Sequence, residues 1–386
     1  ISVVDPVKQD QGGLNPYITY KINTTTDRPD FQYGQFSVIR RFKDFVWLSE
    51  RLGEEFPGVI NPPLPDKETL KRFDPEHIER RRVELEHYLG RVAAHGELSG
   101  APVFMAFLQA DDAAMADKKE EAKVARKEDK GGPGAELKRH WGWAVTMVKS
   151  QMGLDQAAEG KSEADLKFDA IGAYVNELDT QVQVVARHAS ALVKKQEGLG
   201  TTAYDLGFAL TQLGNAERDT PPLGQVLQSA GEKADAASIW LKGKAQKEAE
   251  VFEAPINEYV KIIAAVKAAL GKRHEKKIAY LMAAGEVENR AVAHAKLEGI
   301  AGKEEKLAAA EEALAAARAE LDAAKDDFEQ VTARVLREFD RFRREKAADM
   351  QKMLKAFVTT QIEYNRHVEE CWQGLLPAIE NMEEVR

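Results

Sequence analysis

The chain has 386 residues, of which 31% are charged and 44% hydrophobic, and its formal net charge is -9. This composition is typical of a protein rich in solvated helix and excludes an extensively disordered chain, while the negative charge argues against nonspecific nucleic-acid binding. The single cysteine, Cys371, excludes a disulfide framework and a zinc site built from cysteines, and it fits a reducing compartment. No apolar run approaches the ~20 residues that span a bilayer. Because Ile1 already lies in a predicted strand, we expect the chain to be truncated at its N-terminus.

Residues 1–110 contain most of the prolines and most of the alternation of apolar and polar residues that predicts β-strands. The predicted strands cover residues 1–7, 17–24 and 34–42. Helices are predicted at about 44–55 and after Asp74, where an aspartate N-cap precedes a proline at the first helical position. The pattern therefore predicts a small α+β module with a three-stranded antiparallel sheet.

Basic residues recur in this module at three places where a phosphate group could be bound. Arg40 and Arg41 end a strand just before a helix, and the ring of Phe42 beside them offers a flat face. Lys67 follows a stiff proline loop, and Arg81 lies beside the apolar face of the second helix. If these cations converge, each charge-assisted hydrogen bond to an anion contributes ~1.5–3 kcal/mol. The arrangement suits a polyanionic headgroup.

Plainer explanations exist for some of these residues. Arg40 and Arg82 could be solvated, or could pair with Glu79 and Glu84, since surface ion pairs are common and weak. The prolines at 62–65 could also form a ligand for an SH3-type domain, although they lie inside the pattern of the module.

Residues 111–135 are predicted to be a linker of mixed charge that ends in glycines and a proline. Residues 136–153 follow helical spacing with an apolar face and a basic face, which predicts a helix that inserts into a membrane interface. The alternative is a core helix that packs on its own protein. The apolar face comprises Leu137, Trp141, Val145, Val148 and Met152.

Three long helical stretches follow, at about 163–214, 223–298 and 303–380, separated by prolines 221–222 and by residues 299–302. A helix of ~75 residues would be ~110 Å long, so such helices bury their apolar faces by pairing, usually across a dimer. Pro255 lies inside the second stretch and is expected to kink it. The pattern predicts a curved all-helical dimer.

Basic residues form separate stripes on the second and third long helices, away from an apolar packing seam that runs from Phe328 to Phe342. Such stripes are expected to face anionic lipid, at ~1 kcal/mol per residue near the surface. Pairing along the helix with Glu338, Asp340 and Glu345 is the alternative. The candidate membrane-facing residues are Lys267, Lys272, Arg273, Lys276, Lys277, Arg290, Lys296, Arg334, Arg337, Arg341 and Arg344.

The segments RRFKDF (40–45), PPLPDK (62–67) and ERRRVELEHYL (79–89) occur in the order and spacing of a PX (phox homology) domain, which residues 1–110 resemble. The resemblance implies that Arg41 holds the 3-phosphate of phosphatidylinositol 3-phosphate and that Phe42 stacks under the inositol ring. It also implies that Lys67 approaches the 1-phosphate and that Arg81 bonds the 4- and 5-hydroxyls. Phosphatidylinositol 3,5-bisphosphate is the alternative ligand, because tolerance of a 5-phosphate depends on pocket width.

Three long helices after a PX-like module look like a BAR domain, here a long three-helix coiled-coil bundle at residues 163–386. The whole chain resembles sorting nexins of the sorting nexin 1/Vps5 type, including the segments LVKKQEGLG (192–200) and WQGLLPAIE (372–380). The resemblance implies a homodimer, or a heterodimer with another sorting nexin, that cooperates with the retromer core trimer and tubulates membranes. The implied location is the cytoplasm and the cytosolic face of endosomes, and also the trans-Golgi network.

The sequence is compatible with two functions. The first is a peripheral membrane protein that reads a phosphoinositide and membrane curvature, and the second is a cytoplasmic coiled-coil scaffold whose PX-like module binds protein. A strict heptad would favour the scaffold, whereas interruptions at Pro255, Gly271 and Gly285 favour the membrane protein. We expect no enzyme activity, cofactor or metal site, since the sequence has no GxSxG or HExxH motif and no phosphate-binding glycine loop.

Overall fold

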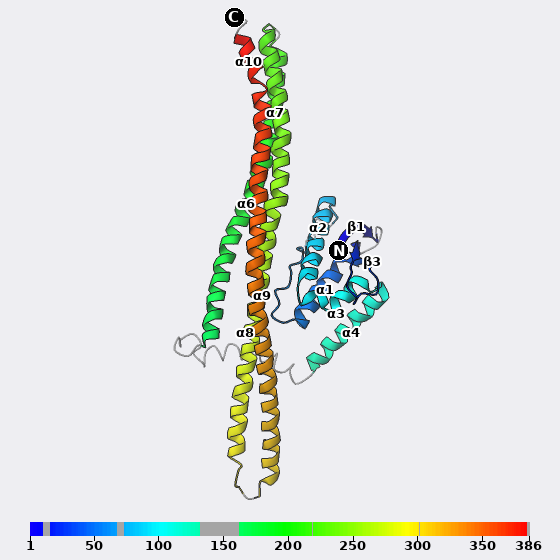
Figure 1. Ribbon diagram of the computed structural model, residues 1–386, viewed down its shortest axis with the longest axis vertical. Helices are drawn as coiled ribbons and strands as arrows, with labels where there is room; N and C mark the ends of the chain where they lie inside the picture. Colours follow the sequence, from blue (N-terminus) through cyan, green and yellow to red (C-terminus); the bar gives the residue numbers. More distant parts are fainter. Residues whose placement is uncertain (11–15, 68–72, 132–161, 218, 301, 384–386) are drawn as a thin grey trace. The chain divides into compact units, whose positions relative to one another are not determined.

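The computed structural model describes residues 1–10, 16–67, 73–131, 162–217, 219–300 and 302–383 (Figure 1). Side chains are not described for residues 125–131, 382 and 383. The chain divides into two units. Unit 1 combines Ile1–Gly172 with Ala265–Phe339, and unit 2 combines Ala173–Ala264 with Asp340–Arg386.

Unit 1 contains a three-stranded antiparallel sheet in the order β1 (Ser2–Gln9), β2 (Tyr17–Thr25) and β3 (Gln35–Arg41). On β2, Tyr20 and Ile22 are almost fully buried and alternate with residues that are half-buried or exposed, which is the period of a sheet with one face on a core. Strand β1 breaks its register between Val4 and Val7, around Pro6, which cannot donate to a ladder. The predicted three-stranded antiparallel sheet is confirmed.

Helices α1 (Phe42–Glu55), α2 (Pro75–Ala94) and α3 (Pro102–Gln109), with the short turn η1 (Leu98–Gly100), complete the core of this module. Helix α1 begins directly after β3 because the Arg41 backbone N–H donates to the Asp44 carboxylate at 2.8 Å. Helix α2 starts as predicted, with Asp74 accepting from the backbone N–H of Glu76 at 2.9 Å. The shared core includes Phe45, Leu48, Leu85, Leu89 and Phe107.

The segment predicted as a linker instead contains helix α4 (Asp112–Gly131). Its residues are mostly good helix formers, and Met115, which is 3% exposed, joins the core cluster of the sheet and α1–α3. Lys119 adds a hydrogen bond from its ammonium group to the Asp44 carboxylate. Helix α4 therefore starts as part of the same body, and we call β1–β3 with α1–α4 the N-terminal module.

The remaining helices are α6 (Glu163–Ala216), α7 (Pro221–Glu248), α8 (Ala254–Ala295), α9 (Glu304–Gln373) and α10 (Leu376–Glu383). The predicted breaks are confirmed, because α7 begins at Pro221 and the turn between α8 and α9 contains Gly299 and Gly302 at positive φ. The predicted disturbance at Pro255 takes the form of a π-helical turn, η2 (Ala249–Glu253), immediately before it. The predicted fold class, an α+β module followed by long helices, is confirmed.

Within unit 2, α7 and α9 lie side by side and share polar contacts as well as apolar ones (Figure 1). The Lys244 ammonium donates to the Asn365 side-chain oxygen at 2.8 Å, and the Trp240 ring stacks on His367 with centroids 3.9 Å apart. Lys244 is only 7% exposed, so this bond compensates a charge taken out of water.

Candidate functional site

The structure brings together three of the predicted phosphate-binding segments around Arg81. The Arg81 guanidinium lies over the Phe42 ring, 4.7 Å from its centroid. Its Nη2 donates to the backbone oxygen of Asp66 at 2.9 Å, which ties α2 to the proline loop next to Lys67. We call Phe42, Asp66, Lys67 and Arg81 the Arg81 cluster.

The Arg81 cluster holds positive charge with unused bonding capacity. Arg81 is 8% exposed, and among the described residues its Nε has no hydrogen-bond partner. Burial raises the pKa of the neighbouring Tyr20 hydroxyl, and the positive charge of Arg81 partly offsets that rise. Lys67 is exposed at the edge of the cluster. A fixed guanidinium, an exposed ammonium and an aromatic face are the groups that bind a phosphorylated ring.

Arg41 lies next to the Arg81 cluster in sequence, but its described contacts are different. Its side chain is 48% exposed, and its Nε lies 3.6 Å from a carboxylate oxygen of Asp44. Its guanidinium lies 5.7 Å from the centroid of the Tyr17 ring. In this structure Arg41 is therefore accessible, and it is held by the start of α1 and by β2.

Arg40, also predicted to bind the headgroup, is a structural residue. It is 2% exposed, and its guanidinium donates to the backbone oxygens of Ile39, Phe107 and Ala110. Burial lowers the pKa of Arg40, against the opposing charge of Asp44 and two further aspartates. The prediction that Arg40 binds the headgroup is therefore wrong. The alternation of side chains along a strand could have predicted this, because neighbours on β3 point to opposite faces and, of the two arginines, only Arg41 is exposed.

The predicted membrane-inserting helix, with Leu137, Trp141, Val145, Val148 and Met152, lies outside the described residues. It remains a prediction from the sequence.

Three of the basic residues predicted to face lipid on α8 bind acidic residues of other helices. Arg273, 7% exposed, donates to Asp165 at 3.0 Å and lies 3.7 Å from the centroid of the Phe168 ring. Lys277 pairs with Asp165 at 2.7 Å, and Lys276 donates to Asp327 at 2.6 Å. Burial raises the pKa of Asp165, but hydrogen bonds from its partners outweigh this and hold the pKa well below its ordinary value. Arg273 is thus part of the packing between helices and not a lipid contact.

Other members of the predicted basic surface lie nearer to solvent. Lys272 and Arg290 form ion pairs with Glu275 and Glu286 along α8, and Lys267 is half-buried. Arg341 pairs with Glu345 on α9 at 2.8 Å, as the alternative prediction had it. Lys296 and Arg344 are exposed.

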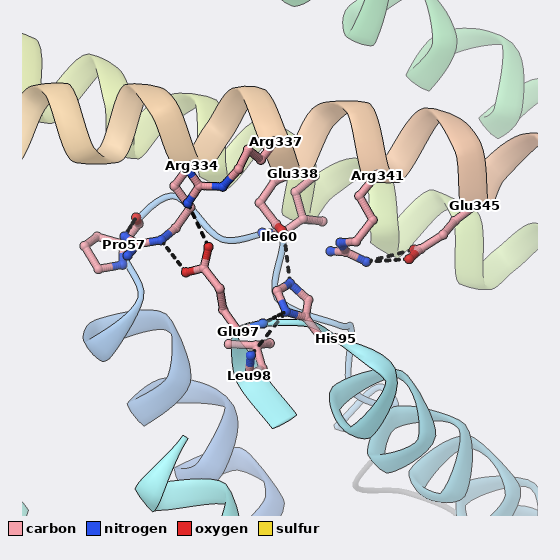
Figure 2. Close-up of polar contacts among 10 residues, drawn as sticks. All are labelled: Pro57, Ile60, His95, Glu97, Leu98, Arg334, Arg337, Glu338, Arg341 and Glu345. Carbon is pink, nitrogen blue, oxygen red and sulfur yellow. Dashed lines mark hydrogen bonds and ion pairs between the residues drawn. The ribbon is translucent and has the colours of Figure 1, made fainter. Parts of the chain in front are cut away.

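Arg334 and Arg337 of α9, also predicted to face lipid, instead bind the N-terminal module (Figure 2). Arg334 donates from Nε to Glu97 at 2.8 Å and from Nη1 to the Pro57 backbone oxygen at 2.9 Å. Arg337 donates to the second Glu97 oxygen at 2.9 Å. Burial raises the pKa of the Glu97 carboxyl group, but the two arginines more than offset this, so that the pKa lies below its ordinary value.

A buried pair of titratable residues lies at the centre of the same contact (Figure 2). His95 Nδ1 accepts from the backbone N–H groups of Glu97 and Leu98 at 3.1 and 3.2 Å. The ring must then carry its proton on Nε2, which donates to Glu338 across 3.0 Å. The same Glu338 oxygen accepts from the Ile60 backbone N–H at 3.0 Å. Sequence reasoning missed the roles of His95 and Glu338, whose partners lie far away along the chain.

Apolar packing completes the contact. Gly58 adopts φ +89°, and a Cβ there would lie 2.9 Å from a methyl carbon of Val331 and 3.0 Å from one of Val335. Glycine is therefore required both by the backbone and by the approach of α9. We call Pro57–Ile60 and His95–Glu97, together with Val331, Arg334, Val335, Arg337 and Glu338, the α9 contact.

Among the described residues, no group of three or more histidine, cysteine or acidic side chains could hold a metal ion. Within that same part of the chain, no helix is both long and apolar enough to cross a membrane.

Comparison with known proteins identifies both halves of the chain. Residues 28–111 match the PX domain, and residues 144–378 match the family described as Vps5 C terminal like. Sorting nexin 1 of Arabidopsis thaliana is 30% identical over 98% of this chain and 92% of its own length. Sorting nexin-1 of Homo sapiens is 25% identical over 98% of this chain and 71% of its own length.

Among solved structures, the tetramer of the SNX-BAR protein Mvp1 is similar with a TM-score of 0.62, covering 97% of this chain and 99% of that one. Its sequence identity is 13%, so this likeness concerns the fold. The PX segments, the long helices and the full-length similarity agree, and the chain therefore belongs to the sorting nexin family, with a PX domain followed by a Vps5-type BAR domain.

Proposed function

We propose that the chain binds phosphatidylinositol 3-phosphate, or the 3,5-bisphosphate, through Arg41 and the Arg81 cluster on the cytosolic face of endosomes. The observation that carries the proposal is the position of Arg81, which is buried, stacks over the Phe42 ring and is tied to the loop that presents Lys67. Because the guanidinium is held in place before a ligand arrives, little side-chain entropy is lost on binding. Within the part of the chain that the structure describes, the buried Nε of Arg81 has no hydrogen-bond partner, and a headgroup oxygen that reaches it would supply one.

Exposed apolar side chains on unit 2 support the proposal that two copies associate through their helices. Phe208 on α6, Ile239 on α7 and Ile362 on α9 are 60%, 66% and 67% exposed. A second copy of the chain, or another sorting nexin, would remove this surface from water. Two headgroup sites on one particle would then raise the apparent affinity ~10²–10⁴-fold without any new contact.

The proposed biological role follows from these two properties. A dimer that reads a headgroup and senses or tubulates curved membrane would act in retromer-type endosomal sorting and retrograde transport. Insertion of the predicted helix at residues 136–153 would add to its membrane binding. The alternative, a cytoplasmic scaffold whose module binds protein, requires no lipid.

Vesicle flotation tests the proposal, with the full chain and phosphatidylcholine vesicles that contain or lack phosphatidylinositol 3-phosphate. Arg81→Ala is expected to weaken the headgroup-dependent binding about tenfold or more, because it removes charge-assisted hydrogen bonds. Arg80→Ala is the matched control, since Arg80 is the preceding residue on α2 and is exposed. Lys67→Ala, at an exposed loop position, repeats the test without altering the core.

The outcomes separate the two functions. Unchanged headgroup-dependent binding by both Arg81→Ala and Lys67→Ala, with unchanged melting temperatures, would overturn the site assignment. A wild-type chain that floats with neither kind of vesicle would favour the scaffold.

A further inference from the structure

A second cationic site lies on the N-terminal module, between α1 and α4. It is a pocket of about 300 Å³ that is lined mainly by basic side chains. We call it the cationic pocket; its basic residues are Arg41, Lys43, Arg51, Lys119 and Lys123. Apart from Arg41, none of the residues proposed to bind the headgroup lines it, and it therefore offers a separate binding site.

The cationic pocket has more positive than negative charge. Asp44 is the one carboxylate among its lining residues, and it is already shared by Lys119 and Arg41. Arg51 pairs along α1 with Glu54 at 2.6 Å and lies 3.6 Å from Glu55, and Lys123 pairs along α4 with Glu120 at 2.9 Å. Such surface pairs are weak enough to rearrange when a ligand arrives. Lys43 is exposed and has no ion pair within the described part of the chain. An anion would relieve the mutual repulsion of these cations.

One wall of the pocket is aromatic. Trp47 lines it and packs against the core of the module, and the ammonium nitrogen of Lys119 lies 5.9 Å from the centroid of the Trp47 ring. A volume of about 300 Å³ is at the lower limit for ligand pockets, which restricts the occupant to a small group. Cations around a small cavity with a flat wall fit a phosphate ester on a compact polar body.

We propose that the cationic pocket is a second anion-binding site, which takes the phosphate group of a phospholipid headgroup or of a soluble phosphate ester. It does not require the Arg81 cluster. Arg41 borders both sites, so the two sites meet at one exposed guanidinium. A bilayer lipid with a phosphate headgroup could then bind in the cationic pocket while a phosphoinositide occupies the proposed headgroup site.

The test uses the full chain, vesicles of phosphatidylcholine with phosphatidic acid, and a pocket variant that combines Lys43→Ala with Lys123→Ala. Both lysines are exposed, so little effect on folding is expected. Each charge-assisted hydrogen bond to a bound phosphate strengthens binding roughly tenfold, so the pocket variant is expected to bind about a hundredfold more weakly, whereas a basic residue that only lies near an anionic surface contributes roughly fivefold. Lys21→Ala with Lys118→Ala removes the same charge from exposed positions outside the lining and is expected to have a smaller effect.

Fluorine NMR of the fluorotryptophan-labelled chain locates the ligand, with the Trp47 signal assigned through Trp47→Phe. In an Arg81→Ala background, inorganic phosphate or dissolved inositol 1,3-bisphosphate is expected to shift the Trp47 signal if the pocket takes soluble esters. A shift with vesicles alone would assign the pocket to lipid. The proposal is overturned if the pocket variant binds vesicles as tightly as the control variant and none of these ligands shifts the Trp47 signal. This outcome would reject the cationic pocket even if Arg81→Ala abolishes phosphoinositide binding, which concerns the proposed headgroup site alone.

Discussion

Removal of the Glu338 carboxylate is expected to loosen the α9 contact. This carboxylate accepts hydrogen bonds from the Ile60 backbone N–H and from His95 Nε2, each at 3.0 Å. The side chains of His95 and Glu338 are 2% and 6% exposed, so water does not readily replace the lost acceptor. Glu338→Ala would therefore leave two buried donors without this partner.

The size of the effect follows from these two bonds. A hydrogen bond to a charged group contributes ~1.5–3 kcal/mol, and a buried donor left unsatisfied costs ~1–3 kcal/mol. Part of this is offset because a buried carboxylate no longer has to be desolvated. We expect a net loss of ~2–4 kcal/mol in the free energy that holds the module to α9, which corresponds to a factor of ~30 to several hundred in the opening equilibrium.

Hydrogen exchange at the neighbouring Val59 amide measures this opening, because Val59 is buried and its amide donates to the Phe56 backbone oxygen at 3.1 Å, an acceptor that Glu338→Ala leaves in place. Glu338→Ala should accelerate its exchange by about the same factor. Glu345→Ala is the matched control on the same helix, since Glu345 forms an exposed pair with Arg341 and should contribute only ~0.3–0.5 kcal/mol. If the Val59 amide exchanges equally slowly in the wild-type chain and in both variants, the Glu338 carboxylate does not hold the contact, and this explanation is refuted.

Two further predictions concern the helices. Asp165→Asn should lower stability at neutral pH by ~1–3 kcal/mol, because it weakens the pairing of the buried Arg273. The pKa of Asp165 is depressed in the folded state, so the stability that its carboxylate provides is present above about pH 4 and is lost as the pH falls further. The stability of the variant should therefore depend less on acid pH. Denaturant titrations at several pH values would contradict this if both proteins lose stability equally in acid. Phe208→Glu with Ile362→Glu should convert dimers to monomers in analytical ultracentrifugation, whereas exposed Lys195→Glu should not; dimers that persist would contradict the proposed interface.

Local signals in the sequence predicted the element boundaries well. Pro221 starts α7, and glycines with positive φ follow α8, because both residue types act through their own backbone geometry. The charge and proline pattern also led to the Arg81 cluster, in which Phe42 and Arg81 lie together. For α4 the glycines after residue 130 suggested a linker, while the helix-forming residues before them decided the structure.

The errors concern basic residues whose partners are distant in the chain. Arg334 and Glu97 are 237 residues apart, and Arg273 and Asp165 are 108 apart, so no helical periodicity could reveal either pair. A stripe of arginines has the same spacing whether it faces lipid, water or another part of the protein. Tertiary contacts, and not helix geometry, determine which face of α9 remains available to a membrane.

The α9 contact also bears on how a bound headgroup would act on the helices of unit 1. Helix α1 carries Phe42 at its first residue and leads into the loop of Pro57 and Ile60, and α2 carries Arg81 fourteen residues before His95. Each helix thus links the Arg81 cluster to the α9 contact through a rigid span of ~20 Å. If the proposed headgroup site is correct, binding a lipid would orient this part of α9 on the bilayer without a flexible joint. Loosening the contact with Glu338→Ala should then weaken binding to vesicles, because the headgroup site loses its rigid connection to the helices. The affinity for a dissolved headgroup should stay the same, because the headgroup site itself is intact.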